Sequence, residues 1–185
     1  MDGCIMQSTK MIGLYHIYKE VRKMLNKKMI KLMNEQINKE LESAYLYLDF
    51  VNYFTEKELN GFAHWYKVQA QEEVEHAERF MDYLHDENEK VILTAIDKVK
   101  CNCKDDLTVL HAGLEHEIYI TRLIHELYAE AEELKDYRSL KFLDWFVNEQ
   151  AEEEKNANEL INRYEMFAKG SKEGLYQLDH ELGER

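Results

Sequence analysis

The sequence contains no proline and only seven glycines among its 185 residues. Proline kinks or ends a helix and glycine weakens one, so long uninterrupted helices are favoured over sheets. Also missing is any apolar run close to the roughly 18 residues that a membrane span needs, and the first residues lack the basic and apolar regions of a signal peptide. We therefore expect an all-α protein that lies in the cytoplasm and has no membrane partner.

Cysteine is scarce as well, and basic residues are outnumbered by acidic ones. The three cysteines are Cys4, Cys101 and Cys103, and an odd number cannot all pair within one chain. We expect Cys101 and Cys103 to be free thiols in a reducing compartment; the alternative is that they bind a soft metal or a redox partner. Acidic residues outnumber basic ones by 37 to 24, which gives a net charge of −13. Because such a surface repels phosphate backbones and attracts cations, we expect metal ions and not nucleic acid as partners.

Apolar residues recur with the 3.6-residue period of amphipathic helices in four long segments and one short one. The long segments cover residues 26–57, 61–88, 105–133 and 137–168, and the short one covers 174–182. Asn60-Gly61 favours a turn, Asp136 a helix cap, and Gly170-Ser171 an entry into the last helix. The linker 89–104 is much longer than the others, which is typical of a crossover along a bundle. The pattern predicts two helical hairpins joined by a crossover between the second and third helices.

Residues 1–23 are the least readable part of the sequence. Their apolar spacing allows an amphipathic helix, which would make the segment a docking or anchoring arm. The alternative is an appended or wrongly assigned start before a domain that begins near Met24. We treat residues 1–23 as an N-terminal extension of unknown role and residues 24–185 as one domain.

Each long segment places an acid on its apolar face. The acids are Glu40, Glu73, Glu117 and Glu153, with His76 one turn after Glu73 and Gln150 one turn before Glu153. A buried carboxylate costs on the order of several kcal/mol unless its charge is cancelled, and a metal pair bound by carboxylates and imidazole would cancel it. Tyr47, on the same face as Glu40, would be a hydrogen-bond donor and one-electron source beside such metals. The alternative is a plain bundle whose helices are rotated so that the acids reach solvent.

The motifs around these acids resemble those of bacterial non-haem ferritins, which are ferritin-like di-iron carboxylate proteins. The matching segments are Asn34–Glu40, Ser43–Tyr47, Ala70–His76, Glu115–Glu117, Asn148–Glu154 and Gly174–Leu182. The resemblance extends over about residues 24–185 and is specific in the combination and order of the motifs. It implies a ferritin-like four-helix bundle with a short fifth C-terminal helix. The chain departs from di-iron bundles with two Glu-x-x-His pairs, because its second pair is Gln150-x-x-Glu153.

The resemblance also implies a set of iron ligands. A first iron would be bound by Glu40, Glu73 and His76, with Glu73 bridging to a second iron that is served by Glu117 and Gln150. Tyr47 and Trp145 would lie close to both. An auxiliary third iron site would consist of Glu72, Glu149, Glu152 and Glu153. No haem is expected, because Val74 stands where bacterioferritins have their haem-binding methionine.

By function, the resemblance implies an iron-storage protein with ferroxidase activity. Such a protein oxidises Fe(II) with O2 or H2O2 and deposits ferric mineral inside a shell of 24 subunits, with the fifth helix at a symmetry axis. Two other functions stay open at this point. One is a di-iron redox enzyme that stores no iron, similar to a rubrerythrin or a peroxide scavenger, and the other is a structural bundle without metal.

Overall fold

The computed structural model describes residues 25–99, 101 and 103–184, so the expected extension 1–23 lies outside it. Every regular element in the described part is a helix, as the sequence predicts. The elements are α2 (Lys27–Glu56), α3 (Asn60–Asp86), α4 (Asp106–Glu133), α5 (Tyr137–Arg163), the π-helix η1 (Tyr164–Ala168) and α6 (Lys172–Leu182). None of these helices is long and apolar enough to cross a membrane.

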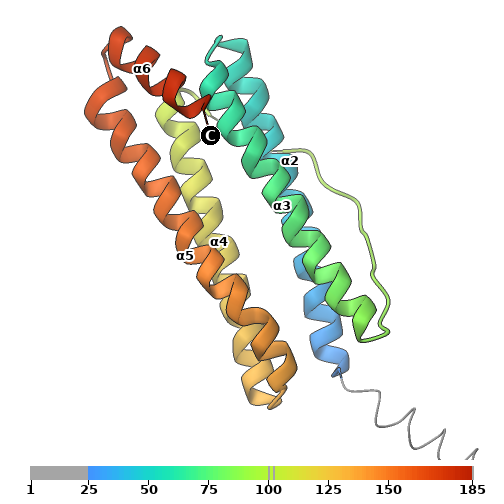
Figure 1. The fold of residues 1–185 in the computed structure, drawn as a ribbon. Coiled ribbons are helices and arrows are strands. Elements are labelled where there is room, and N and C mark those ends of the chain that lie inside the picture. Colours follow the sequence, from blue (N-terminus) through green and yellow to red (C-terminus); the bar gives the residue numbers. More distant parts are fainter. Residues whose placement is uncertain (1–24, 100, 102, 185) are drawn as a thin grey trace, which may run out of the picture.

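The four long helices form two hairpins, α2 beside α3 and α4 beside α5, with α6 lying across one end (Figure 1). The predicted crossover lies between the end of α3 and the start of α4 and follows the length of the bundle, and its described residues form no helix or strand (Figure 1). Two asparagines one turn apart on α2 hold it. The Asn34 amide donates to Lys90 O (3.1 Å) and accepts from Ile92 N (2.6 Å). The Asn38 amide donates to Ile92 O (2.8 Å) and accepts from Thr94 N (2.7 Å).

The connection between α2 and α3 differs from the prediction. The turn was expected at Asn60-Gly61, but α3 already begins at Asn60. The chain reverses at Glu58, which has a φ of 59°, and Leu59 N donates to Phe54 O (3.0 Å). The predicted cap at Asp136 is confirmed, since its side chain accepts from Ser139 N at 3.2 Å.

The start of α3 is capped by the last helix of the chain. Leu59, at the N-cap position, offers no side-chain hydrogen bond. Instead Asp179 Oδ1 of α6 accepts from Gly61 N (2.8 Å) and from Phe62 N (3.0 Å). A Cβ built on Gly61 would lie 1.6 Å from the carbonyl oxygen of Asp179. Glycine is therefore required here for a close approach of two backbones, and not for a turn.

The structure joins Cys101 to Cys103 in a disulfide within the crossover. The expectation that both are free thiols is wrong for this structure, because a single intervening residue is enough to bring the two side chains together. Both cysteines are half-buried and pack against the apolar residues at the α6 end of the bundle.

Two apolar clusters fill the bundle. The α6-side cluster includes Phe50, Phe54, Phe62, Tyr66 and Leu110. The far cluster includes Met29, Met33, Ile37, Phe80 and Phe146. Burial of these side chains supplies most of the driving force for folding. Between the two clusters the interior is polar, and that layer holds the acids singled out by the sequence.

Candidate metal centre

The buried polar layer consists of six side chains, drawn from all four long helices. Each has a relative exposure of 4% or less, and they are Glu40, Glu73, His76, Glu117, Gln150 and Glu153. The prediction that these residues face inward is confirmed for all six. The alternative of a rotated bundle with solvated acids is therefore wrong.

The first half of the layer is the group Glu40, Glu73 and His76. One ligand atom from each residue lies within 4.8 Å of the others, and Glu73 Oε2 is 3.3 Å from His76 Nδ1. Gln36 Nε2 donates to Glu40 Oε1 (2.9 Å). Glu40 Oε2 and Glu73 Oε2 are buried and have no hydrogen-bond partner among the described residues. Without a cation, a proton held by Glu40 can be shared with Glu73. A cation bound between the two carboxylates would satisfy both oxygen atoms in its place.

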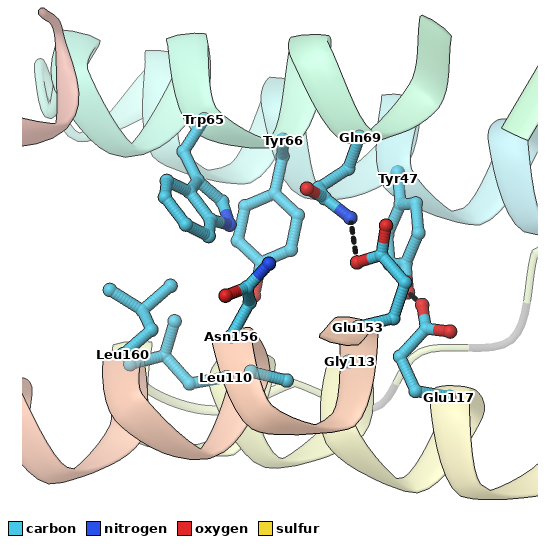
Figure 2. A pocket seen from close by; sticks show the side chains of 11 residues that line it. Tyr47, Trp65, Tyr66, Gln69, Leu110, Gly113, Glu117, Glu153, Asn156 and Leu160 are labelled. Atoms are coloured by element: carbon cyan, nitrogen blue, oxygen red, sulfur yellow. Dashed lines mark hydrogen bonds between the residues drawn. The ribbon is translucent and has the colours of Figure 1, made fainter. Parts of the chain in front are cut away.

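The second half of the layer is the group Glu117, Gln150 and Glu153. Three of its carboxylate oxygens already accept hydrogen bonds. Glu117 accepts from the Tyr47 hydroxyl and, at 3.2 Å, from Gln150 Nε2, while Glu153 Oε2 accepts from Gln69 Nε2 at 2.7 Å. Figure 2 shows the bonds from Tyr47 and Gln69 converging on this half from α2 and α3. A metal entering here has to displace or rearrange these hydrogen bonds.

Burial dominates the electrostatics of both halves. It raises the pKa of Glu73 and that of Glu117 to about 8 each, and the nearby charge of Glu153 is the next contribution in both cases. Burial also raises the pKa of Glu40 well above its usual range, with Glu73 adding to the effect. Without a cation these carboxyls hold protons near neutral pH, so metal binding is coupled to proton release.

The four acids implied for a third iron site differ from the buried polar layer in their exposure to solvent. Glu153 is buried, Glu72 and Glu149 are half-buried, and Glu152 is exposed. Glu149 Oε1 lies 3.8 Å from His76 Nε2, which places it next to the first half of the layer. Among the described residues, Glu40, Glu73 and His76 of the first half form a group close enough to hold one metal ion. The four acids of the implied third site do not form such a group.

Tyr47 and Trp145 lie against the two halves. Tyr47 is buried and donates to Glu117. The Trp145 ring packs edge-on against the His76 ring, with centroids 5.5 Å apart, and the Arg79 guanidinium lies 3.9 Å from the Trp145 ring centroid. These contacts fix the orientation of the His76 imidazole.

Three residues of the site escaped the sequence analysis, namely Gln36, Gln69 and His116. Gln36 stands four residues before Glu40 and Gln69 four before Glu73, so each shares a helix face with a buried acid, and this spacing was a usable signal. His116 is hydrogen-bonded to Ser43 Oγ through Nε2 (2.7 Å), and burial lowers its pKa to about 4. It is therefore neutral near pH 7.

Comparisons with known proteins agree with this geometry. The family model described as ferritin-like domain matches residues 30–167, which include the whole buried polar layer. A bacterial non-heme ferritin of Campylobacter jejuni is 35% identical over 156 residues, covering 84% of this chain and 93% of the relative. One from Bacteroides fragilis is 34% identical over 162 residues, covering 88% of this chain and all of the relative. The crystal structure of an open pore ferritin from the archaeon Archaeoglobus fulgidus superposes with a TM-score of 0.85 at 36% identity, covering 88% of this chain and 99% of that one. The chain therefore belongs to the ferritin family.

Proposed function

We propose that this protein is an iron-storage ferritin that oxidises Fe(II) to Fe(III) at the buried polar layer and retains the product as a ferric mineral. The observation that supports this most directly is the first half, where two buried carboxylate oxygens that accept no hydrogen bond from the described residues lie beside the His76 imidazole. Oxygen and imidazole donors suit redox-active iron, and iron here is the substrate of the reaction. Membership of the ferritin family points to the same activity.

In this proposal Glu40, Glu73 and His76 bind the first Fe(II), and Glu73 bridges to the second. Glu117 and Gln150 serve the second ion, with Glu153 in the same half of the layer. The carboxylates lower the energy of Fe(III) relative to Fe(II), because the ion with the larger charge gains more from the same anions. Tyr47 donates a hydrogen bond to Glu117, and in this proposal it supplies one electron when the oxidant needs more electrons than the two irons give.

The remaining parts of the proposal concern assembly and transit. We expect 24 subunits to form a hollow shell, with α6 at a symmetry axis. Glu72, Glu149, Glu152 and Glu153 would form an auxiliary iron site, and movement of the exposed Glu152 would be needed to complete it. The absence of haem and a cytoplasmic location stay predictions from the sequence.

The decisive experiment is an aerobic Fe(II) titration of the iron-free protein, followed by ferric absorbance and then by sizing of the product. Rapid oxidation with many irons per subunit in a large shell is expected. Saturation near two irons per subunit would instead identify a di-iron redox enzyme without storage, and no oxidation above buffer would leave a structural bundle. Glu73→Ala should remove the fast phase, whereas Glu75→Ala, an exposed position on the same helix, is the matched control.

A further inference from the structure

A cavity of about 20 Å³ lies beside the second half of the layer and is lined by side chains from α2, α3, α4 and α5 (Figure 2). Its polar lining comes from Tyr47, Tyr66, Gln69, Glu117, Glu153 and Asn156. One water molecule needs a cavity in which its centre can move through roughly 10–15 Å³, and the same measure gives the volume of this cavity. The cavity therefore has room for one molecule of water size or slightly larger, next to the proposed second iron.

Tyr66 and Gly113 build the far wall of this cavity. Tyr66 is 4% exposed, and its ring extends from α3 across the bundle towards α4 and α5 (Figure 2). Burial alone raises the pKa of the Tyr66 hydroxyl, and no hydrogen bond from another described residue contributes. A Cβ built on Gly113 would lie 3.2 Å from the Tyr66 hydroxyl oxygen. Glycine at 113 thus leaves space for the Tyr66 hydroxyl group, which is directed into the cavity and has no hydrogen-bond partner among the described residues.

The lining selects for a small molecule that both donates and accepts hydrogen bonds. The carboxylate oxygens of Glu117 and Glu153 each accept one hydrogen bond from Tyr47, Gln150 or Gln69 and can accept a second. The Tyr66 hydroxyl and the Asn156 amide offer donors. A ligand that displaces an ordered water keeps its affinity only if it reproduces the hydrogen bonds of that water. Hydrogen peroxide can do so at both of its oxygens, whereas dioxygen offers neither a donor nor a strong acceptor.

We propose that this cavity is the binding site of hydrogen peroxide as oxidant, with the Tyr66 hydroxyl as its hydrogen-bond donor and Gly113 as the residue that keeps the space open. The inference rests on the proposed ferroxidase function and names its oxidant. In the reaction two Fe(II) ions give one electron each, the O–O bond of H2O2 breaks, and two protons from solvent complete two molecules of water.

The test compares two oxidants on the assembled protein. Initial rates of Fe(II) oxidation are measured by stopped flow, once with O2 and once with H2O2 under anaerobic conditions. In Tyr66→Phe, loss of one hydrogen bond should lower the ratio of the H2O2 rate to the O2 rate about three- to tenfold and raise the KM for H2O2. Gly113→Ala should shift the ratio in the same direction by narrowing the cavity. Tyr83→Phe is the matched control, because its hydroxyl bonds Ser139 (3.0 Å) away from the layer.

A fall of the ratio in either cavity variant supports the proposal. An unchanged ratio in both, or equal losses with the two oxidants, would overturn it while leaving the ferroxidase function intact. Failure of the wild-type protein to oxidise Fe(II) with either oxidant would instead reject the proposed function itself. The two failures are therefore distinguishable in one set of traces.

Discussion

The two halves of the buried polar layer contain similar carboxylates but differ in how their oxygen atoms are satisfied. In the first half, Glu40 Oε2 and Glu73 Oε2 have no hydrogen-bond partner among the described residues. In the second half, Tyr47, Gln69 and Gln150 donate to the carboxylates. The first half is thus arranged for a cation before one arrives, whereas the second half has an alternative network that competes with metal binding.

This difference has a functional consequence. A preformed site binds without the cost of rearrangement, whereas a site that must break internal hydrogen bonds binds more weakly and exchanges faster. Iron in the first half should therefore be retained, and iron in the second half should be the one that leaves after oxidation.

The largest effect is expected when one carboxylate is removed from each half. Glu40→Ala should eliminate the tighter of two binding events for Co(II), with a loss of about 100-fold in affinity or more, whereas Glu117→Ala should eliminate only the weaker one. Isothermal titration with the iron-free protein measures both. Equal losses of both events in each variant would show that the halves act as one unit and that the contrast is wrong.

The next effect concerns pH. The pKa values of Glu73 and Glu117 are raised to about 8 in the folded, metal-free protein, from about 4.3 in an unfolded chain. A raised carboxyl pKa means that the folded state holds its proton more tightly, so the contribution is fully present below pH 4 and is lost as pH rises towards 8. Between pH 5 and 8, each of these two groups should lower the stability of the metal-free protein by on the order of 3–4 kcal/mol.

Calorimetric unfolding temperatures at pH 5 and pH 8 measure this loss. The double variant Glu73→Gln and Glu117→Gln keeps the shape of the side chains but cannot titrate, so its unfolding temperature should depend less on pH. Parallel curves for the two proteins would mean that other groups set the pH dependence.

A smaller effect on stability and metal binding is expected when Gln69, a hydrogen-bond donor to the second half, is replaced. Gln69→Leu removes the hydrogen bond to Glu153, which should cost about 1–3 kcal/mol of stability without metal. The same change should tighten the weaker metal-binding event several-fold, because the competing network is weakened. Gln36→Leu is the counterpart in the first half and should leave the weaker event unchanged. If Gln69→Leu also weakened metal binding, the network would be an aid to the metal and not a competitor.

The smallest effect is expected at the end of the bundle. Asp179→Ala removes the cap of α3 and should lower stability by about 1 kcal/mol, or a few degrees in unfolding temperature. Because α6 packs on the cluster that adjoins the second half, only the weaker metal-binding event should change measurably. Gln177→Ala, exposed on the same helix, provides the baseline. An effect confined to the tighter event would contradict the proposed division.

The sequence was sufficient to predict the helices, the crossover and the inward acids, because each of these features depends on periodicity within one segment. Glu40 and His76 were found since they interrupt an apolar stripe at helical spacing. The start of α3 was misplaced because its cap, Asp179, comes from 118 residues further along the chain. The bond from Gln69 to Glu153 also escaped prediction, since Gln69 follows the same face as Glu73 but reaches across to another helix. Such contacts depend on the distance and rotation between helices, which periodicity does not encode.

The spacing of Asn34 and Asn38 on α2 also matches the spacing of alternate residues in the crossover. Four residues of α-helix advance about 6 Å, and two residues of extended chain advance about 6.6 Å, so Asn34 and Asn38 match every second residue of the segment beside them. In an extended segment, the backbone N–H and C=O groups of successive residues point to opposite sides. A deletion or insertion of one residue between Lys90 and Thr94 would therefore turn the groups that pair with one asparagine away from it. The two asparagines of α2 therefore set the register of residues 90–94 against the first hairpin.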